Sequence, residues 1–469
     1  HNELKNAQTD TLLKSAFSFD ALSFYLKNNA GAANNFNAEY TLRHDRVANN
    51  NQFKQSTLGH TFSLNTNITS FKNQDVKITG AYRILDITDT SLTTLKPDES
   101  LLGRLEYNFT ALKGLVSGNV LYELGSGQEP RREFTYVKVV AGQGLYVWRD
   151  YNKDSVEQLN EFELAIFPDE KLYIRIFTPT NQYVKAKYSV YNQSISINPK
   201  TILNQSNLKG VKKLLAIFYL QSAVQLNNRF IGKQGIAQYN PFIDYQNDTL
   251  LLNNTSSIMN AVYVNRFNNN WGLDYIYTIN AGKTLMTYGI DSRKNDEHLL
   301  RGRVNATKKF TIGLTLRTAN KTYASLFLEN RNYLIANKTA EPNITWVFLR
   351  NQVRILSSYK YDHRKNNPRY GGETAIAHNI NVDIRYNIIT SGSINLRTTY
   401  ANIKYNGISN SSLGYTMLDG LQNGKNYLWQ ASFEKRVSKN IEMSLQYEGR
   451  KPAGTPTVHT GRATVRAIF

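Results

Sequence analysis

The segment IEMSLQYEG, residues 441–449, decides the fold class because its side chains alternate with a period of two. Its uncharged row is Ile441, Met443, Leu445, Tyr447 and Gly449, and its polar row is Glu442, Ser444, Gln446 and Glu448. Successive side chains of a β-strand point to opposite faces of the sheet, so each row lies on one face. The segment therefore predicts a strand with one apolar face and one wet face.

Other segments repeat this alternation. The stretches YLWQASFE at 427–434 and GRATVRAIF at 461–469 place uncharged residues opposite polar or charged ones. The same period of two recurs at 376–388, at 310–316 and at 271–279. These predicted strands share an uncharged outer row and a polar inner row.

Connection lengths separate a barrel from a soluble sandwich, which also alternates. Few residues join the strands at one end, at 438–440, 390–393, 349–350 and 307–309, whereas long polar loops join them at the other, at 405–424 and 362–372. Short turns on one side, longer loops on the other and strands of about 10 residues are typical of outer-membrane barrels. We predict an all-β fold, an antiparallel transmembrane β-barrel of roughly 14 strands or more.

The chain divides into three predicted parts. Residues 1–140 form a strand-rich region that alternates at 36–43 and at 104–109, and this region is either further barrel strands or a separate β-domain. A connecting segment follows at 141–182, and the barrel occupies 183–469.

Composition agrees with a membrane barrel. The 469 residues carry a formal net charge of +20 and include no cysteine, which excludes disulfides and thiolate metal sites. No stretch approaches 18 consecutive apolar residues, so the sequence predicts no transmembrane helix. A polar average composition is compatible with a barrel because half of each strand faces water or protein. The chain begins at His1 without an apolar signal stretch, which indicates a processed form or a fragment.

An acidic cluster interrupts this basic chain at 150–170. An even spread of the 36 acids would place about two there. The window instead holds seven, with Lys153 as its one basic residue: Asp150, Asp154, Glu157, Glu161, Glu163, Asp169 and Glu170. Such an excess requires a physical cause.

The spacing within this cluster predicts a structural Ca²⁺ site. The predicted ligands occupy positions 1, 3, 5, 7, 9 and 12 of an EF-hand-type loop: Asp150, Asn152, Asp154, Val156 through its backbone carbonyl, Gln158 and Glu161. Ser155 stands at position 6, where glycine is expected, and costs about 1 kcal/mol if its φ is positive. A turn held by Asx hydrogen bonds without metal is the alternative. Five matching side chains favour calcium.

Two segments carry a resemblance to a known family. They are GQGLYVWRDYNKDSVEQLNEFELAIFPDEKLYIRIFTPTNQY at 142–183 and LQYEGRKPAGTPTVHTGRATVRAIF at 445–469, which ends in the aromatic Phe469. They resemble a group of large, mostly uncharacterised outer-membrane proteins of Bacteroidota, whose members commonly have Gly where Ser155 stands. The resemblance implies an outer-membrane barrel and, since members are longer, a fragment. Some such barrels act within multi-protein outer-membrane machines.

Catalysis and nucleic-acid binding have no support in the sequence. The seven histidines form neither an i, i+4 pair nor an HExxH motif, and we do not expect an enzyme. His378 and His459 fall on apolar rows, where we expect an interfacial position or a protein contact. No aromatic-interleaved basic groove indicates nucleic acid.

Basic residues suggest lipid contacts and an alternative pore. Five that we place in loops would contact phosphates of lipopolysaccharide: Arg293, Lys294, Arg364, Lys365 and Lys425. Four inward arginines would select anions in an open lumen: Arg385, Arg436, Arg462 and Arg466. Nearby acids favour cross-strand pairing instead: Asp383, Glu434, Glu442 and Glu448.

The expected function is therefore that of a scaffold or partner-binding subunit of an outer-membrane assembly or secretion complex. The calcium loop would have a structural role in docking another protein. A porin-like pore with anion preference is the alternative.

Overall fold

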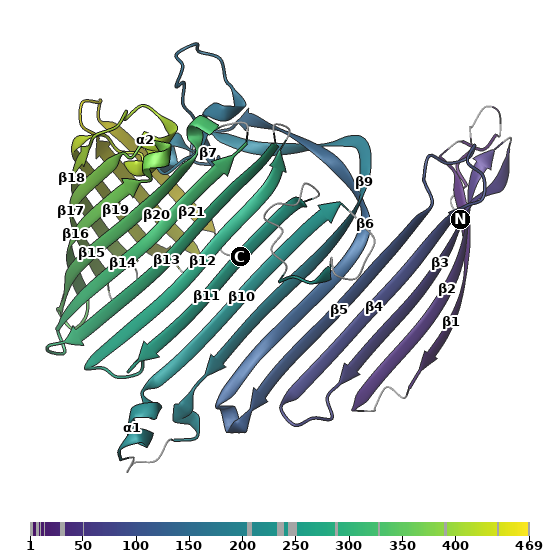
Figure 1. Ribbon diagram of the computed structural model, residues 1–469, viewed down its shortest axis with the longest axis horizontal. Coiled ribbons are helices and arrows are strands. Elements are labelled where there is room, and N and C mark those ends of the chain that lie inside the picture. Colours follow the sequence, from purple (N-terminus) through teal and green to yellow (C-terminus); the bar gives the residue numbers. More distant parts are fainter. Residues whose placement is uncertain are drawn as a thin grey trace. The chain divides into compact units, whose positions relative to one another are not determined.

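The computed structural model describes most of the chain (Figure 1). The residues outside the description are 1, 2, 6–8, 10, 14, 29–32, 50, 204–208, 232–238, 243–250, 287, 288, 327, 328, 389–391, 439, 468 and 469, together with the side chains of 128–133, 179–184, 286 and 289. The predicted turn at 390–393 and the terminal Phe469 fall wholly or partly outside it.

The fold is all-β, as predicted. Its strands are β1 (Phe17–Lys27), β2 (Asn34–Asn49), β3 (Gln52–Ile68), β4 (Gln74–Ile87), β5 (Asp98–Ala111), β6 (Val116–Lys138), β7 (Tyr146–Trp148), β8 (Phe162–Leu164), β9 (Tyr173–Ile197), β10 (Phe218–Ile231), β11 (Leu251–Val264), β12 (Trp271–Met286), β13 (Gly289–Asn305), β14 (Phe310–Ser325), β15 (Tyr333–Phe348), β16 (Val353–Asn366), β17 (Thr374–Ile388), β18 (Gly392–Tyr405), β19 (Gly424–Ser438), β20 (Ile441–Lys451) and β21 (Val458–Ala467).

The helical elements are short. They are η1 (Leu112–Gly114), η2 (Leu159–Glu161), η3 (Pro168–Glu170), η4 (Pro199–Thr201), α1 (Val211–Ala216), η6 (Glu329–Arg331), η7 (Pro368–Tyr370) and α2 (Ser412–Met417). Within the described part of the chain, no helix is long and apolar enough to cross a membrane.

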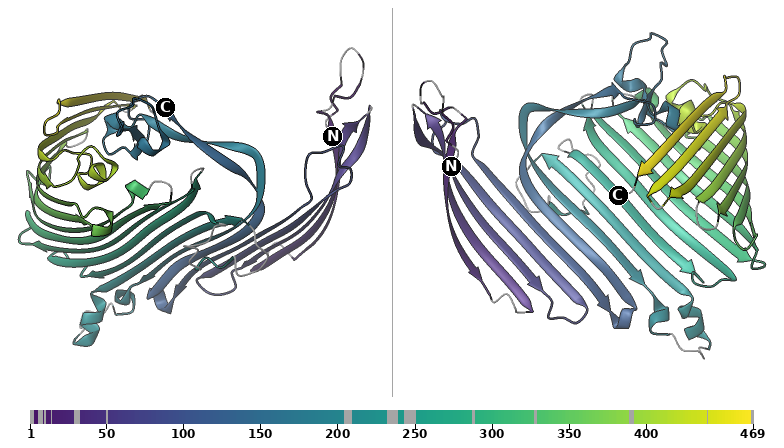
Figure 2. Two further views of the ribbon diagram at one scale, coloured as in Figure 1. Left: turned by 45° about the horizontal axis from the view of Figure 1, so that its top comes forward. Right: turned by 180° about the vertical axis from the view of Figure 1, so that it is seen from behind.

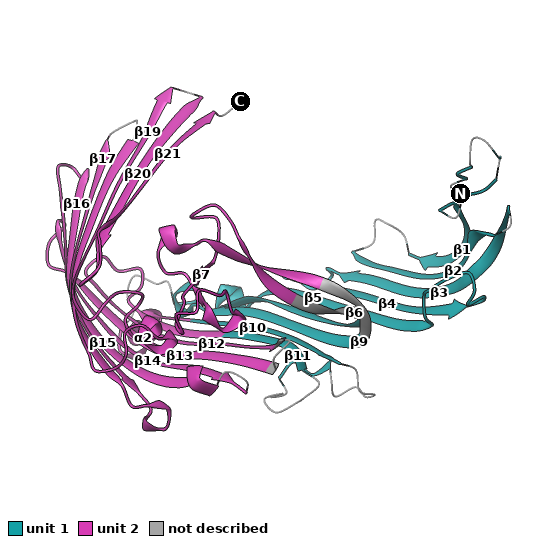
Figure 3. Cartoon of the chain, turned by 90° about the horizontal axis from the view of Figure 1, so that it is seen from above, with its two compact units in different colours: residues 1–131, 180–206, 221–257 teal, residues 132–179, 207–220, 258–469 magenta. Residues whose placement is uncertain are grey.

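Two compact units divide the chain, and both are discontinuous in sequence (Figure 3). Unit 1 comprises 1–131, 180–206 and 221–257, and unit 2 comprises 132–179, 207–220 and 258–469. The predicted three-part division stays a prediction.

In unit 1, strands β1 to β6 pair antiparallel, each with the next along the chain. The predicted alternating segments 36–43 and 104–109 lie in β2 and β5. Gly80 and Gly103 are directly opposite each other on β4 and β5.

In unit 2, strands β12 to β21 likewise form consecutive antiparallel pairs (Figure 2). The register joins the predicted rows, since Phe433 lies opposite Leu445 and Leu445 opposite Ala463. Directly opposite residues share a face, so the sheet has one apolar face and one polar face.

The apolar face of unit 2 is exposed. Ile380 is 51% exposed, Ile344 48% and Leu445 42%. His378 and His459 lie on this face, where their Nδ1 atoms are 2.7 and 2.9 Å from the hydroxyls of Tyr359 and Tyr447. An exposed apolar face this wide needs an apolar environment, because water would impose a large cost on it.

The connections between strands follow the predicted pattern of short turns at one end and long loops at the other. The long loop at 405–424 is confirmed, because β18 ends at Tyr405 and β19 begins at Gly424. The loop predicted at 362–372 starts later, since β16 continues to Asn366. Short turns lie at the other end of the strands: residues 306–309 join β13 to β14, and residues 349–352 join β15 to β16.

Loop 406–423 folds onto the polar face rather than extending into solvent. Met417 and Leu418 are each 1% exposed and join a buried cluster with five strand residues: Ile335, Ala375, Ala377, Ile403 and Tyr405. Arg364 fixes the loop by donating to the Met417 carbonyl at 2.8 Å and by pairing with Asp419, and it also pairs with Asp362 of its own strand. Burial of these apolar side chains holds the loop against the strands.

The placement of five basic residues in loops was wrong. All of them belong to strands: Arg293, Lys294, Arg364, Lys365 and Lys425. Arg364 is 9% exposed and is therefore a structural ion-pair residue. Its buried position follows from Asp362 beside it, which is fully buried and needs a cation.

Candidate calcium-binding segment

The residues 142–172, called the acidic segment below, are organised by a small hairpin. Strand β7 pairs antiparallel with β8, with Val147 opposite Glu163. The predicted calcium loop, 150–161, connects these two strands, so both of its ends are fixed. Helix η2 forms its last turn.

Backbone amides of the loop donate hydrogen bonds to carboxylates of the same loop. Asp150 accepts hydrogen bonds from the amides of Asp154 at 3.2 Å and Ser155 at 3.0 Å. Asp154 accepts from the amide of Val156 at 2.7 Å. Oxygens of Asp150, Asp154 and Glu161 consequently lie within 4.8 Å of one another, although like charges at this separation repel. A cation would relieve this repulsion.

Glu161 is the most firmly held of the predicted ligands. Its side chain is 2% exposed and accepts hydrogen bonds from Trp148 Nε1 at 2.9 Å, from the amide of Tyr151 at 3.3 Å and from the amide of Gln158 at 3.4 Å. A carboxylate fixed by three donors is preorganised to bind a cation.

The remaining predicted ligands adjoin this centre in different ways. The side-chain amides of Asn152 and Gln158 donate to Asp154 Oδ2 at 2.9 and 2.6 Å. Only an amide oxygen ligates Ca²⁺, so ligation requires both amides to turn their oxygens inward. Val156 joins the loop through its amide, and its side chain is 57% exposed.

Ser155 adopts the conformation that the loop reserves for glycine, with φ at +61°. We expect Ser155→Gly to stabilise the ordered loop by about 1 kcal/mol, because glycine adopts positive φ without steric cost. This corresponds to about fivefold tighter Ca²⁺ binding, measured by calorimetric titration of the purified protein. Ser155→Ala is the control, since it removes the hydroxyl but keeps Cβ. An equal gain in both variants would contradict the strain argument.

Three acids of the cluster serve a different purpose, which the sequence argument missed. Glu163 pairs with Arg331, and Glu170 accepts from Arg149 and Arg450, each at 3.0 Å. Asp169 also pairs with Arg450. The acidic excess thus has two causes, because these ion pairs attach the segment to the rest of unit 2.

Tyr415 of α2 completes the attachment. Its hydroxyl accepts from the amide of Ile166 at 3.1 Å and lies 3.3 Å from the carbonyl of Leu164, and the Arg149 guanidinium lies 4.5 Å from its ring centroid. Burial raises the pKa of Tyr415, which keeps the hydroxyl protonated as a donor. Burial likewise raises the pKa of Tyr151, whose hydroxyl donates to Glu163 at 3.3 Å.

Cross-strand pairing of the polar-face arginines occurs in part. Arg436 pairs with Glu442 at 2.9 Å, as expected. Asp383 pairs with Arg397 at 2.8 Å, whereas Arg385 donates to Asn387 at 3.1 Å. Acid neighbours therefore reduce the positive charge of this face.

No family model matches the chain, and no curated protein matches it. Among solved structures it is similar to the siderophore receptor PirA from Pseudomonas aeruginosa, with 10% identity over 96% of this chain and 70% of that chain and a TM-score of 0.41. The ferric-catecholate import receptor Fiu from E. coli, in its open form, gives 8% identity over 96% and 73%, with a TM-score of 0.37. OmpT with loop L8 deleted, an outer membrane protein of Vibrio cholerae, gives 9% over 83% and 95%, with a TM-score of 0.29. These structural neighbours are outer-membrane β-barrels, and the similarity concerns the fold alone.

Proposed function

We propose that this chain is an outer-membrane β-barrel wall that serves as a scaffold or partner-binding subunit of an assembly or secretion complex. The observation that carries the proposal is the attachment of the acidic segment to the rest of unit 2 by buried ion pairs. Arg331 is 11% exposed and Glu163 is 9% exposed. A segment held this firmly presents a fixed surface rather than a loose loop.

The exposed side chains of the acidic segment support a protein partner. Several large aliphatic residues face outward although the segment is anchored: Leu145 at 59% exposed, Val156 at 57%, Leu164 at 49% and Ile166 at 45%. Such apolar side chains on a rigid element are typical of interaction surfaces. The resemblance to Bacteroidota outer-membrane proteins agrees with a role in a larger machine.

Calcium would hold this surface in shape. Bound to the carboxylates of Asp150, Asp154 and Glu161, the ion would neutralise the repulsion between them. Extracellular-type calcium loops have dissociation constants of about 10⁻⁴ to 10⁻³ M, which suits a compartment outside the cytoplasm. The acidic segment contacts the long loop 406–423, and long loops are extracellular in outer-membrane barrels.

Extraction of the native protein in mild detergent, followed by mass spectrometry of attached proteins with and without EGTA, tests this role. We expect stable partners that dissociate when EGTA removes calcium. The control is EGTA followed by excess CaCl₂, which should restore the complex. A bare protein that EGTA leaves unchanged would contradict docking through the acidic segment.

The membrane position is tested by two adjacent residues of β20. Leu445→Arg places a charge on the exposed apolar face and should cost about 2–4 kcal/mol of stability in a bilayer. Ser444→Arg, its control, faces Glu434 on the polar face and should cost less than about 1 kcal/mol. Urea unfolding in phosphatidylcholine vesicles measures both. Equal tolerance of the two would contradict a lipid-facing wall.

A porin-like pore with anion preference is the second candidate. Arg397 and Arg436 of the polar face are 63% and 58% exposed, which favours it, although both are paired with acids. The acidic segment and loop 406–423 cover part of this face. Anion-selective conductance of the purified protein in a planar bilayer would support the pore over the scaffold.

A further inference from the structure

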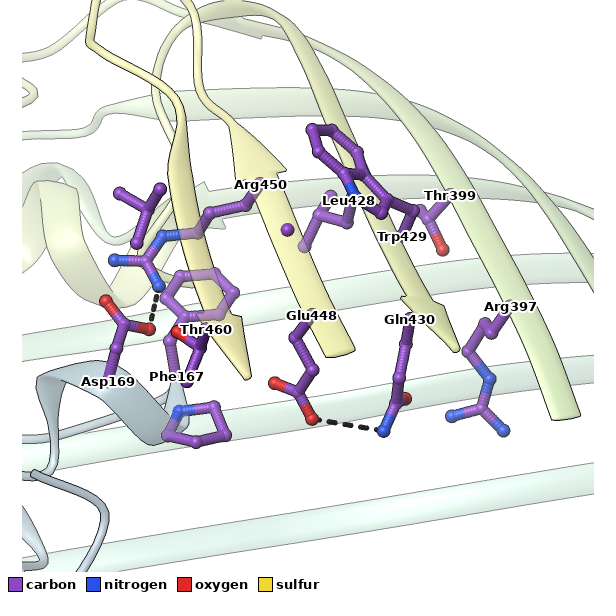
Figure 4. A pocket seen from close by; sticks show the side chains of 13 residues that line it. Phe167, Asp169, Arg397, Thr399, Leu428, Trp429, Gln430, Glu448, Arg450 and Thr460 are labelled. Atoms are coloured by element: carbon purple, nitrogen blue, oxygen red, sulfur yellow. Dashed lines mark hydrogen bonds and ion pairs between the residues drawn. The ribbon is translucent and has the colours of Figure 1, made fainter. Parts of the chain in front are cut away.

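A cavity of about 160 Å³ lies where η3 of the acidic segment meets strands β18 to β21 (Figure 4). Phe167, Pro168, Leu428 and Val458 contribute apolar lining. A cavity of this size has room for a single small ring rather than a chain. All of its lining residues belong to unit 2.

Four polar side chains converge on the cavity from four adjacent strands. Arg397 lies opposite Gln430, Gln430 opposite Glu448, and Glu448 opposite Thr460. Directly opposite residues share a face, so these four form one continuous row. Figure 4 shows Arg397, Gln430 and Glu448 side by side and Thr460 beside Phe167. Phe167 lies at the Thr460 end of this row, and Leu428 and Val458 share the face of the row because each lies two residues before a member of it.

The row retains hydrogen-bonding capacity. Gln430 Nε2 donates to Glu448 Oε1 at 3.1 Å, and Arg397 donates through Nε and Nη2 to Asp383. Among the contacts described for these residues, none engages Glu448 Oε2, Gln430 Oε1, Arg397 Nη1 or the Thr460 hydroxyl. The cavity thus offers acceptors and donors together.

The charged residues around the cavity limit the class of ligand that it can bind. Arg450 is neutralised by Asp169 and Glu170, and Arg397 by Asp383. Within the described ion pairs, Glu448 has no cationic partner, so its carboxylate would repel phosphate or another anion. An ammonium group provides donors alone and would leave the Arg397 Nη1 donor unmatched.

We infer that this cavity is a subsite for one neutral sugar ring. Each sugar hydroxyl both donates and accepts, which matches the mixed row of Arg397, Gln430, Glu448 and Thr460. The C–H face of the ring would pack on Pro168, on Val458 and on the side of Phe167 away from the Arg450 guanidinium, which lies 4.3 Å from the Phe167 ring centroid. Binding of a sugar goes beyond docking of a protein partner. It would use the row of polar side chains in the cavity and not the exposed surface of the acidic segment.

Saturation-transfer NMR on the full chain tests the inference, in a zwitterionic detergent because glycoside detergents would compete. The probes are methyl β-D-glucopyranoside, methyl β-D-galactopyranoside and methyl α-D-mannopyranoside, with methylammonium chloride as the cation probe. We expect at least one glycoside to bind and methylammonium not to bind. Binding of methylammonium alone, or of no probe, overturns the inference.

Paired variants locate the binding. Glu448→Gln should weaken glycoside binding about tenfold or more, and Thr460→Val about threefold to tenfold. Glu434→Gln and Thr464→Val, on the same face of β19 and β21, should leave it unchanged. Both test substitutions are close in shape to the native residue, and thermal unfolding verifies that each variant is folded. Equal affinity in test and control variants overturns the assignment.

Discussion

Glu161→Gln should weaken Ca²⁺ binding to the acidic segment at least about a hundredfold. Loss of a residue that merely supports a metal ligand costs about 10- to 100-fold, and Glu161 is itself the expected bidentate ligand at position 12. The native carboxylate accepts hydrogen bonds from Trp148 and from the amides of Tyr151 and Gln158. In the glutamine variant the side-chain NH₂ group would face some of these donors and could not accept from them. The result is a site with less charge and poorer geometry.

Terbium luminescence measures this change directly. Trp148 Nε1 lies 2.9 Å from Glu161 Oε2, so excitation of this indole should sensitise Tb³⁺ bound in the loop. Competition with CaCl₂ then gives the calcium affinity. Glu157→Gln is the matched control, because Glu157 is outside the ligand positions and accepts instead from the Tyr173 hydroxyl. Asp154→Asn, at an exposed ligand position, should also weaken binding. Sensitised Tb³⁺ binding that is unchanged in Glu161→Gln would refute the calcium site.

The fold could be predicted from the sequence where apolar and polar side chains alternate along a whole strand. Residues 441–449 lie in β20, and the predicted loop 405–424 matches the observed strand ends. Helix α2 within that loop was not predicted, because the surrounding loop is rich in Asn, Ser and Gly and gives no sign that Met417 and Leu418 are buried. Their burial depends on strand residues far away in the sequence, which periodicity does not report.

The candidate site could be predicted only in its local part. The carboxylates of Asp150, Asp154 and Glu161 occupy a single loop, so their spacing carries the geometry. Arg331 and Arg450 lie 168 and 281 residues from the acids that they pair with. In the sequence these arginines are ordinary basic residues, and only the tertiary pairing of strands brings them to the segment.

Arg331→Met should release the acidic segment and lower the free energy of unfolding by about 3–5 kcal/mol. The substitution leaves Glu163 buried without its cation, which costs far more than a lost surface pair. It also removes the donors to the Asn160 carbonyl, at 2.6 Å, and to Ser412, at 3.1 Å. Thermal unfolding in detergent gives the stability, and limited proteolysis reports exposure of the segment.

Two further variants separate charge burial from general damage to the fold. Arg436→Met removes an arginine whose pair with Glu442 is exposed, so it should cost less than about 1 kcal/mol. Adding Glu163→Gln to Arg331→Met removes the stranded charge and should recover about half of the loss, since a neutral amide is cheaper to bury than a carboxylate. If the double variant is no more stable than Arg331→Met, the loss does not come from the stranded charge of Glu163. Arg331 would then hold the segment through its hydrogen bonds to the Asn160 carbonyl and Ser412, which both variants lack.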